Sequence, residues 1–378
     1  MTKFPQIEGL RATLAITVII AHCAQIIDVP SNPTVVHKLF LLGQISVMIF
    51  IIVSGFVIAN LIIEKQEPYG PYIVRRFFRI YPLYIICCIA GAATLWMYPE
   101  ALRQLPWANA APWDSVIASQ SDRFGEHSIA HALLLHGAIS NNVLPYSAFV
   151  FLPPSWSLSL EWQFYLTAPL IVAWCTQRRT LLLIVCTIAA ALFYRGTFGT
   201  FELESALPGA GPYFMIGIAS RLLWPHLRGT IKNPATLALG FTALIPMSNQ
   251  NIVSVLLWAI FFCFLCADQH SPAVFDKVFS SPIAMFWGKR SYSIYLTHFP
   301  ILTVCAWALT HFALPRWEFA LALAFITLPI TAIATMATYW LIERPGIALG
   351  RRLSYNLPNR RSRVISDAPM SGSARPPT

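Results

Sequence analysis

Charged residues are scarce in this chain. Lys, Arg, Asp and Glu make up 11% of its 378 residues, whereas hydrophobic residues make up 56%. An ordinary soluble domain carries roughly 25% charged residues, so this chain has too little charge to cover soluble domains of its length. The composition excludes a soluble multidomain protein, a disordered chain and a collagen-like chain. It indicates one polytopic membrane domain.

Cysteines are absent from the polar segments of the chain. All eight lie inside apolar runs, where a small thiol behaves as a core side chain. This placement excludes a disulfide-stapled secreted module, and a Cys-x-x-Cys pair without a second pair predicts no metal site. The eight cysteines are Cys23, Cys87, Cys88, Cys175, Cys186, Cys263, Cys266 and Cys305.

Ten apolar stretches are candidates for membrane helices, since a spanning helix needs about 20 mostly apolar residues. We therefore predict an all-α, polytopic membrane protein with about ten transmembrane helices. The first stretch has no small-residue cleavage site, and another stretch follows at once, so we expect a retained helix and not a signal peptide. The stretches cover residues 11–29, 39–63, 80–98, 155–175, 180–194, 207–224, 234–248, 251–267, 291–312 and 317–342.

The basic residues indicate how these helices are oriented. With the N-terminus in the cytoplasm, 21 of the 26 Lys and Arg residues fall in cytoplasmic segments, as the positive-inside rule expects. The sequence thus predicts that both termini are cytoplasmic. The net charge of +10 follows from this topology and does not indicate nucleic-acid binding. The exceptions are Lys38, Arg103, Arg123, Arg195 and Arg316.

One long connection and one basic tail lie outside the apolar stretches. Residues 99–154 are predicted to form an outer loop, whose Trp107 and Trp113 suit either sugar stacking or the aromatic belt of a membrane interface. The membrane domain is expected to cover residues 1–345. The tail 346–378 is basic and rich in Pro, Ser and Gly, so we expect its last 20 residues to be disordered.

Few ionisable residues lie inside the predicted spans, where charges are costly and are functional candidates, and His22 and Glu161 are among them. His22 is eleven residues past Arg11, which at about 1.5 Å per residue is roughly 16 Å along the first helix, near the middle of the bilayer. Glu161 lies six residues into the fourth span, among Ser and Gln residues. Each residue could be structural, as a helix-to-helix hydrogen bond or an ion pair. The functional alternative is that Glu161 faces His22 across a cavity and orients it.

Arg76 and Arg79 form a second candidate site, at the cytoplasmic mouth of the third span. They are three residues apart, so they share one helix face and present two guanidinium groups to one anion. Such clusters also set topology and bind anionic lipids. A phosphorylated ligand would suit this pair.

Ser291, Tyr295 and His298 follow helical spacing at the start of the ninth span, so we expect them to share one face. They would line a cavity or join helices by hydrogen bonds, and the sequence favours neither reading. The other histidines lie in loops or near span ends, and we expect them to be interfacial or solvated. They are His37, His127, His131, His136, His226, His270 and His311.

Six motifs follow one another along these stretches. They are Arg11-x10-His22, Ser54-Gly55-Phe56, Arg76-x2-Arg79-Ile80-Tyr81-Pro82, the run from Ser157 to Tyr165 that contains Glu161, the run from Ser291 to His298, and Glu343-Arg344-Pro345. In content and order they resemble the motifs of the acyltransferase-3 family, integral-membrane O-acyltransferases that decorate glycans. The resemblance runs from residue 7 to about residue 345, nearly the whole chain.

The resemblance implies transfer of an acyl group, usually acetyl, from cytoplasmic acyl-CoA to a hydroxyl group in the inner membrane of a bacterium. An exopolysaccharide, a lipopolysaccharide or a related glycan is the implied acceptor. Acetyl-CoA or another acyl-CoA is the donor, and no metal is implied.

The candidate residues can be assigned to this reaction. Arg11, Arg76 and Arg79 would bind the phosphates of coenzyme A, and Ser291, Tyr295 and His298 would line the cavity or bind the thioester. His22 would act as general base on the acceptor hydroxyl or as a transient acyl carrier. Glu161 would orient His22 and stabilise its imidazolium form.

Two positions depart from the family pattern. Met48 and Trp162 stand where many relatives have acidic residues, so roles of those carboxylates do not carry over to this chain. The chain is also expected to lack the extracytoplasmic esterase-like domain of longer members. Acceptor handling would then fall to the membrane domain and the loop 99–154.

A proton-coupled transporter or glycolipid flippase, with His22 and Glu161 as a proton relay, is the main alternative. Such proteins often contain inverted repeats with paired broken helices, but only the stretch 207–224 is rich in Gly and Pro and it has no matching partner. A membrane acyltransferase for lipids or peptides is a further alternative, which the arginine motifs disfavour. Turnover of acyl-CoA separates an enzyme from a transporter.

Overall fold

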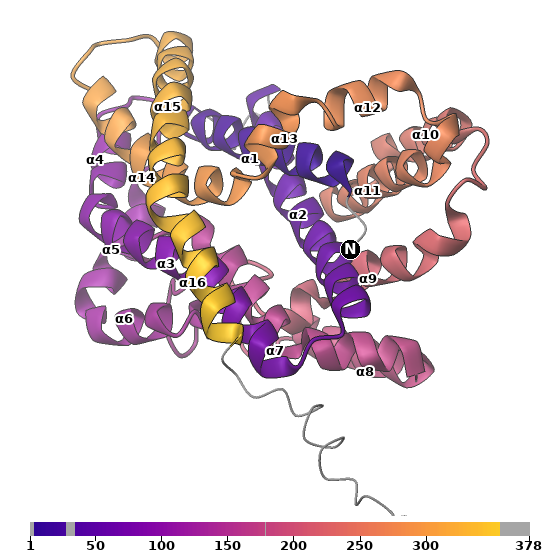
Figure 1. Cartoon of the computed structure of the whole chain (residues 1–378). Helices are drawn as coiled ribbons and strands as arrows, with labels where there is room; N and C mark the ends of the chain where they lie inside the picture. Colours follow the sequence, from indigo (N-terminus) through magenta and orange to yellow (C-terminus); the bar gives the residue numbers. More distant parts are fainter. Residues whose placement is uncertain (1–3, 28–34, 178, 356–378) are drawn as a thin grey trace, which may run out of the picture.

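A computed structural model describes residues 4–27, 35–177 and 179–355 of the protein (Figure 1). Every regular element in these ranges is a helix, which confirms the all-α prediction. The main helices are α1 (Pro5–Gln25), α2 (Val35–Lys65), α3 (Tyr69–Thr94), α4 (Met97–Arg103), α5 (Ala111–Asp122), α6 (Phe124–Ala132), α7 (Trp156–Gln177), α8 (Arg179–Tyr194), α9 (Leu207–Leu227), α10 (Pro234–Leu244), α11 (Gln250–Ala267), α12 (Ala273–Phe279), α13 (Pro282–Gly288), α14 (Ser291–Leu309), α15 (Arg316–Thr338) and α16 (Arg344–Tyr355).

Short turns of other helix types complete the chain. Two 3-10 turns, η1 (His136–Ala138) and η2 (Pro153–Ser155), lie between α6 and α7. A π-helical turn, Tyr339–Glu343, joins α15 to α16. Since α16 continues to Tyr355, the helical part of the chain runs ten residues past the expected boundary at 345. The predicted disorder of the last residues lies outside the described ranges.

The described helices include six that are long and apolar enough to cross a membrane. They support a multi-pass membrane protein. The six are Pro5–Gln25, Leu41–Lys65, Tyr69–Thr94, Gln250–His270, Ser291–Leu309 and Arg316–Tyr355. Each of the ten predicted stretches coincides with a helix, but α8 has 16 residues and α10 has 11, which is short for a spanning helix. Ten spans and cytoplasmic termini stay predictions.

Two helices that carry candidate residues begin earlier than their hydropathy indicates. The first starts at Pro5 and not at residue 11, and it ends at Gln25, so His22 lies in its last turn. The third starts at Tyr69 and not at residue 80, so the arginines lie within α3. The prolines at these starts favour helix initiation, whereas hydropathy detects only the apolar part of a helix.

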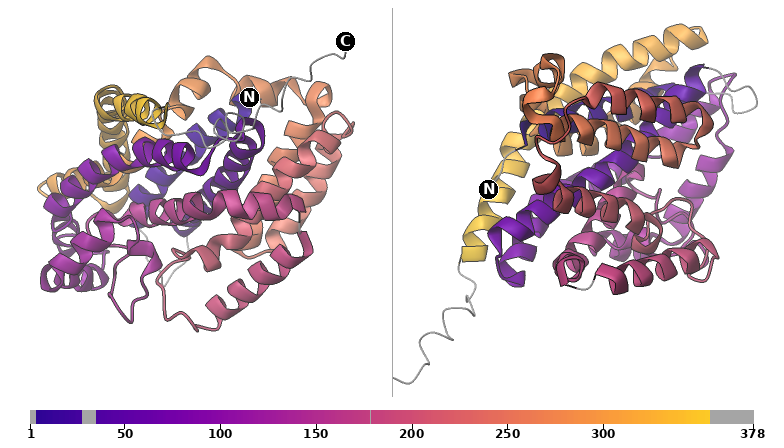
Figure 2. Two further views of the ribbon diagram at one scale, coloured as in Figure 1. Left: turned by 60° about the horizontal axis from the view of Figure 1, so that its bottom comes forward. Right: turned by 90° about the vertical axis from the view of Figure 1, so that its right-hand side faces the viewer.

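α1 and α2 occupy the middle of the molecule, with α8 to α12 on one side and α3 to α6 and α14 to α16 on the other (Figure 1). The views in Figure 2 show the same arrangement from two further directions. Glycines allow the closest helix contacts: a Cβ at Gly217 of α9 would collide with the carbonyl oxygen of Ile52 in α2. A Cβ at Gly288 of α13 would likewise collide with the carbonyl oxygen of Glu8 in α1. Small residues at such crossings are typical of membrane helix packing.

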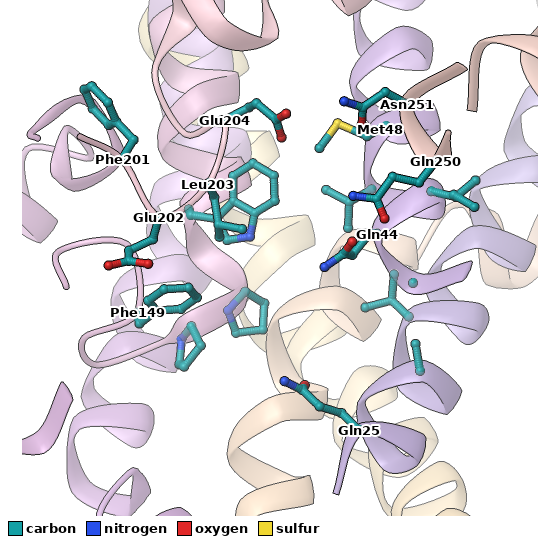
Figure 3. A pocket seen from close by; sticks show the side chains of 18 of the residues that line it. Gln25, Gln44, Met48, Phe149, Phe201, Glu202, Leu203, Glu204, Gln250 and Asn251 are labelled. Atoms are coloured by element: carbon teal, nitrogen blue, oxygen red, sulfur yellow. The ribbon is translucent and has the colours of Figure 1, made fainter. Parts of the chain in front are cut away.

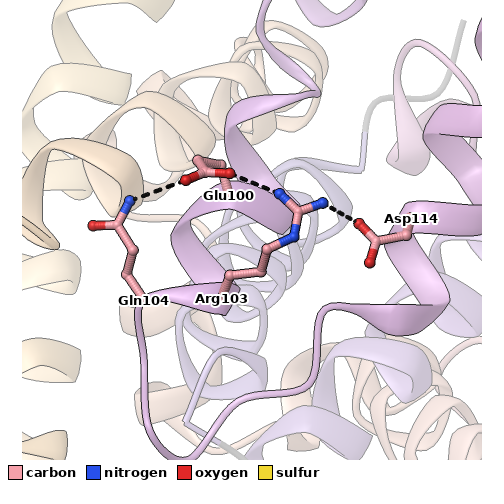
Figure 4. Close-up of polar contacts among 4 residues, drawn as sticks. All are labelled: Glu100, Arg103, Gln104 and Asp114. Atoms are coloured by element: carbon pink, nitrogen blue, oxygen red, sulfur yellow. Dashed lines mark hydrogen bonds and ion pairs between the residues drawn. The ribbon is translucent and has the colours of Figure 1, made fainter.

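The long connection between α3 and α7 is folded and contains α4, α5 and α6. Arg103 at the end of α4 joins the first two of these helices, because it bonds Glu100 at 2.7 Å and Asp114 of α5 at 2.5 Å (Figure 4). Gln104 adds a hydrogen bond of 3.4 Å to Glu100. These contacts are exposed, so each adds little stability by itself. The connection nevertheless supplies part of the wall of the candidate site.

Candidate active site

Two cavities lie one after the other along α1. The arginine cavity, of 240 Å³, is lined by Arg11, Arg76 and Arg79 among others. The histidine cavity, of 670 Å³, is lined by His22 and by residues of the α8–α9 connection and the start of α11. Arg11 lines the first cavity and His22 lines the second. They are eleven residues apart on one helix, so about 16 Å of helix axis separates these two residues.

The arginine cavity contains polar donors without partners. The Nε atom of Arg76 and the hydroxyl of Ser291 are buried and make no hydrogen bond within the described ranges. The Arg76 guanidinium lies 5.8 Å from the centre of the Tyr165 ring, whereas Arg11 is 3.5 Å from the carboxylate of Glu8. Unpaired buried donors on a cationic wall favour an anionic ligand, because that ligand supplies the missing acceptors.

Arg75, the neighbour of Arg76, points elsewhere. It forms an ion pair with Glu67 and a hydrogen bond of 3.3 Å with Ser354 of α16, and it is not among the lining residues. The two adjacent arginines thus differ in role: one is committed to packing α3 against α16, and the other faces the cavity.

Glu161 lines the arginine cavity and does not reach His22. One oxygen of its carboxylate accepts hydrogen bonds from the Ser54 hydroxyl, at 3.0 Å, and from the Tyr165 hydroxyl. In the part of the chain that is described, Glu161 makes no contact with His22, so the predicted contact is wrong for this structure. The reason is geometric: α7 brings Glu161 against α2 and α3, whereas His22 at the end of α1 meets α14.

Gln25 occupies the position at His22 that Glu161 was expected to hold. The Nδ1 atom of His22 lies 3.1 Å from the side-chain oxygen Oε1 of Gln25. An amide oxygen only accepts hydrogen bonds, so Nδ1 carries the proton and Nε2 keeps its lone pair. His22 is thereby held in the tautomer that a general base or a nucleophile requires.

Two of the three residues predicted to share a face of α14 line the cavities. Ser291 lines the arginine cavity, and Tyr295 lines both. His298 is fully buried and stacks on His22, with 5.3 Å between ring centres and 28° between ring planes. Neither ring nitrogen of His298 has a hydrogen-bond partner among the described residues. His298 thus lies behind His22, whereas a residue that binds the thioester would line a cavity.

Tyr295 and Val47 are the two described residues that line both cavities. The Tyr295 hydroxyl donates to the carbonyl oxygen of Pro154 at 2.8 Å. It also forms a hydrogen bond of 2.8 Å with the hydroxyl of Ser157, in which either oxygen can donate. These bonds fix the phenol ring of Tyr295 between the cavities. We call Tyr295 and Val47 together the partition.

Three histidines of the α3–α7 connection are buried, so the prediction that they are interfacial or solvated is wrong. His127 and His136 have no exposed surface and His131 has 2%. His131 and His136 stack with 3.9 Å between ring centres, and Tyr84 of α3 bonds His131 Nδ1 at 3.0 Å. Burial lowers the pKa of His127 to about 4 and that of His136 to about 3.

The burial of these histidines has a sequence signal. His127 and His131 are four residues apart and therefore lie on one face of α6, which packs inward. His226, His270 and His311 are exposed, as expected. The side chain of His37 lies outside the described residues.

The two tryptophans of the connection separate in the structure. Trp113 lines the histidine cavity and lies 6.2 Å, between ring centres, from Phe299. Trp107 packs against Phe319 of α15, and its indole nitrogen is buried. Trp113 is therefore the one of the pair that is placed to touch a ligand.

These features define a helical membrane protein in which a cavity lined by three arginines adjoins a cavity lined by a histidine. The model of the acyltransferase-3 family, described as an acyltransferase domain, matches residues 4–337. The chain belongs to this family.

Several curated relatives are longer proteins of Staphylococcus aureus. One from strain MRSA252, provisionally named an O-acetyltransferase, is 24% identical over 414 aligned residues that cover 94% of this chain. The O-acetyltransferase OatA of the same strain is 26% identical over 396 residues, or 95% of this chain. This chain spans 60% of the first protein and 59% of the second. No solved structure gives a significant match.

Proposed function

We propose that the protein is a membrane O-acyltransferase that moves an acyl group, acetyl in the first instance, from acyl-CoA to a hydroxyl of a glycan. Membership of the acyltransferase-3 family supports this activity, and the matched relatives are named as O-acetyltransferases. The observation that carries the proposal is the meeting of an arginine cavity and a histidine cavity at one partition.

The donor binds in the arginine cavity. The phosphates of coenzyme A accept hydrogen bonds from Arg76, whose Nε is otherwise unpaired, and from Arg79 beside it. Glu161 balances the charge of these arginines in the empty cavity and holds Tyr165 under Arg76. Its proposed role changes accordingly, from orienting His22 to positioning the anion site.

The transfer takes place where the cavities meet. The acceptor hydroxyl oxygen forms a bond to the thioester carbonyl carbon, and the bond from that carbon to sulfur breaks. His22 Nε2 takes the hydroxyl proton, which ends on the sulfur of coenzyme A, so an ester and a thiol are the products. Gln25 keeps the other ring nitrogen protonated throughout.

The proposed topology places the arginine cavity on the cytoplasmic side. The distribution of Lys and Arg supports this orientation, because 21 of 26 would face the cytoplasm. The acyl-CoA then enters from the cytoplasm of a bacterium, and the glycan reaches the histidine cavity from the opposite side of its inner membrane.

The test is acetyl-CoA binding and turnover by the detergent-purified protein. We expect the wild type to bind acetyl-CoA, Arg76→Ala to lose binding, and His22→Ala to bind without turnover. Arg75→Ala is the matched control, and it should bind as the wild type does. A protein that binds no acyl-CoA of any chain length, or a His22→Ala variant with full turnover, would contradict the proposal. Acid-quenched single turnovers with labelled donor show whether His22 carries the acyl group covalently.

A further inference from the structure

The wall of the histidine cavity that lies away from α14 carries several polar side chains, and the proposed chemistry does not use them. It is built by the connection between α8 and α9 and by the first turn of α11 (Figure 3). Glu204 on one side and Asn251 on the other point toward each other across the space, with Gln44 and Gln250 below them. These side chains come from three separate elements, so the wall is a product of the fold and not of one local run.

The α8–α9 connection is held firmly against the α3–α7 connection. The side-chain oxygen of Asn142 accepts hydrogen bonds of 2.8 Å from both the backbone nitrogen and the hydroxyl of Thr200. Asn141 donates a hydrogen bond of 2.8 Å to Glu202, and its backbone nitrogen donates to the Thr200 carbonyl at 2.8 Å. Four bonds to two adjacent asparagines therefore fix the position of Glu204, two residues further along.

The polar groups that face the cavity are free to bind a ligand. Glu204 makes no hydrogen bond or ion pair within residues 4–27, 35–177 and 179–355, and the side-chain amides of Gln44, Gln250 and Asn251 make none there either. A carboxylate accepts hydrogen bonds, while amides both donate and accept. Hydroxyl groups, which also do both, complement such a set.

The charge of the cavity has one sign. Its acidic lining residues are Glu202 and Glu204, and none of the described residues that line it is a lysine or an arginine. A carboxylate or phosphate that entered would lose water and meet two like charges without a cation to pair with. The arginine cavity has the opposite character, since three arginines line it.

The end of the cavity next to His22 is aromatic. Trp113, Phe149 and Phe299 line it there, and the rings of Trp113 and Phe299 are tilted by 31° to one another. Aromatic rings, including Phe201 on the α8–α9 connection, and unpaired hydrogen-bonding groups within one cavity suit a molecule that is itself amphipathic. A sugar ring has this character, with apolar C–H faces and a rim of hydroxyls.

We propose that the histidine cavity admits an uncharged polyhydroxylated acceptor and rejects anionic ones, and that Glu204 determines this specificity. The inference rests on the proposed function for the identity of the reaction, and it narrows the acceptor to glycan units without carboxylate or phosphate at the reacting end. Glu202 at the rim supports the same selection, while Glu204 acts inside the cavity.

The experiment measures the charge selectivity of the cavity without any acyl transfer. Gln44→Cys places a thiol on the α2 wall, and Asn251→Cys places one on the α11 wall. The full-length protein in detergent is treated with a neutral glucosyl methanethiosulfonate or with the anionic sulfonatoethyl reagent. Each rate is divided by that reagent's rate with a free small thiol, and the unsubstituted protein gives the background from the native cysteines.

We expect the neutral reagent to label Gln44→Cys faster than the anionic one by about tenfold after this correction. Glu204→Gln in the same background should remove most of the difference, and Glu202→Gln a smaller part. Glu100→Gln is the matched control, because the Glu100 side chain on α4 is 40% exposed and does not line the cavity. It should leave the ratio unchanged.

Two outcomes would overturn the inference. One is equal corrected rates for the two reagents at both cysteine positions, or a difference that persists in Glu204→Gln. The other is failure of both reagents to label either position, since an acceptor could then not enter. Because no acyl-CoA is present, these results stand whether or not the protein proves to be an acyltransferase.

Discussion

Two pairs of stacked imidazoles lie in the described part of the chain, and one of these pairs borders the histidine cavity. His22 and His298 stack at 5.3 Å, and His131 and His136 stack at 3.9 Å. The second pair is sealed between α3, α6 and α7, and neither member lines the histidine cavity or the arginine cavity. In the first pair only His22 bonds a neighbouring side chain, whereas both members of the second pair do so. What also differs is access to a ligand, so stacked histidines alone do not identify a reactive site.

The largest expected effect is on turnover, which should depend on the pair of His22 and His298 and not on the pair of His131 and His136. His22→Gln should lower acyl transfer by about 10³-fold, because a positioned general base contributes roughly 10²–10⁴-fold. His131→Gln should leave the activity of each folded molecule unchanged and lower the temperature of unfolding. Turnover per folded protein, with folding measured by size-exclusion chromatography, checks both. Loss of turnover in a folded His131→Gln protein would end the distinction.

Acid should lower the stability of the folded protein through the sealed pair of His131 and His136. Burial lowers the folded-state pKa of His136 to about 3, whereas an unfolded histidine has a pKa of about 6.5. The unfolded state therefore binds a proton that the folded state excludes. The full stability is present above about pH 6.5, and it falls by about 1.4 kcal/mol per pH unit for each such histidine as the pH drops toward the folded value.

The measurement is the unfolding temperature between pH 7 and pH 5. The wild type should lose stability over this interval, and His136→Gln should lose less because one of the titrating groups is gone. His127, with a folded pKa of about 4, contributes in the same direction. A wild-type unfolding temperature that is independent of pH in this range would show that the connection does not depend on neutral histidines.

The hydrogen bonds of the two pairs provide a finer comparison. Gln25→Leu removes the acceptor at His22 Nδ1 and releases the ring to its other tautomer, so we expect about a tenfold loss of turnover with unchanged acetyl-CoA binding. Ser155→Ala removes the group 3.2 Å from His136 Nε2. It should change stability and not turnover. Steady-state kinetics with both variants decides, and a Gln25→Leu enzyme of full activity would remove Gln25 from the mechanism.

The smallest expected effect concerns Tyr84, the support of the sealed pair. Tyr84→Phe removes a hydroxyl that lies 3.0 Å from His131 Nδ1 and keeps the ring. We expect a loss of about 1–3 kcal/mol in unfolding free energy, because a buried imidazole nitrogen loses its partner. Thermal unfolding measures the change. An equal loss in turnover would mean that the sealed pair communicates with the histidine cavity.

The sequence predicts the helical class, the positions of the apolar helices and the two arginines that face a cavity. It fails at helix starts, because Pro5 and Tyr69 begin helices whose first turns are polar, and a hydropathy window misses such turns. It also fails at Glu161, since which faces of α1, α2 and α7 meet is a property of tertiary packing. No count along one helix could show that Gln25, three residues from His22, is the partner.

The buried histidines show a related limit. Because His127, His131 and His136 lie in a predicted loop, we expected their side chains to be interfacial or solvated. The α3–α7 connection is, however, long enough to fold and form a core of its own. The spacing of two of them on α6 indicated a shared face. Only the structure showed that this face is covered by Tyr84 and Phe151.

The partition of Val47 and Tyr295 bears on whether ions can leak through the protein. If the two cavities open on opposite sides, as proposed, a bore that joined them would conduct protons and discharge the membrane potential. One phenol ring, tethered to Pro154 and Ser157, closes that route. In the proposed reaction, acyl groups would then cross the membrane while the phenol ring keeps the path closed to ions.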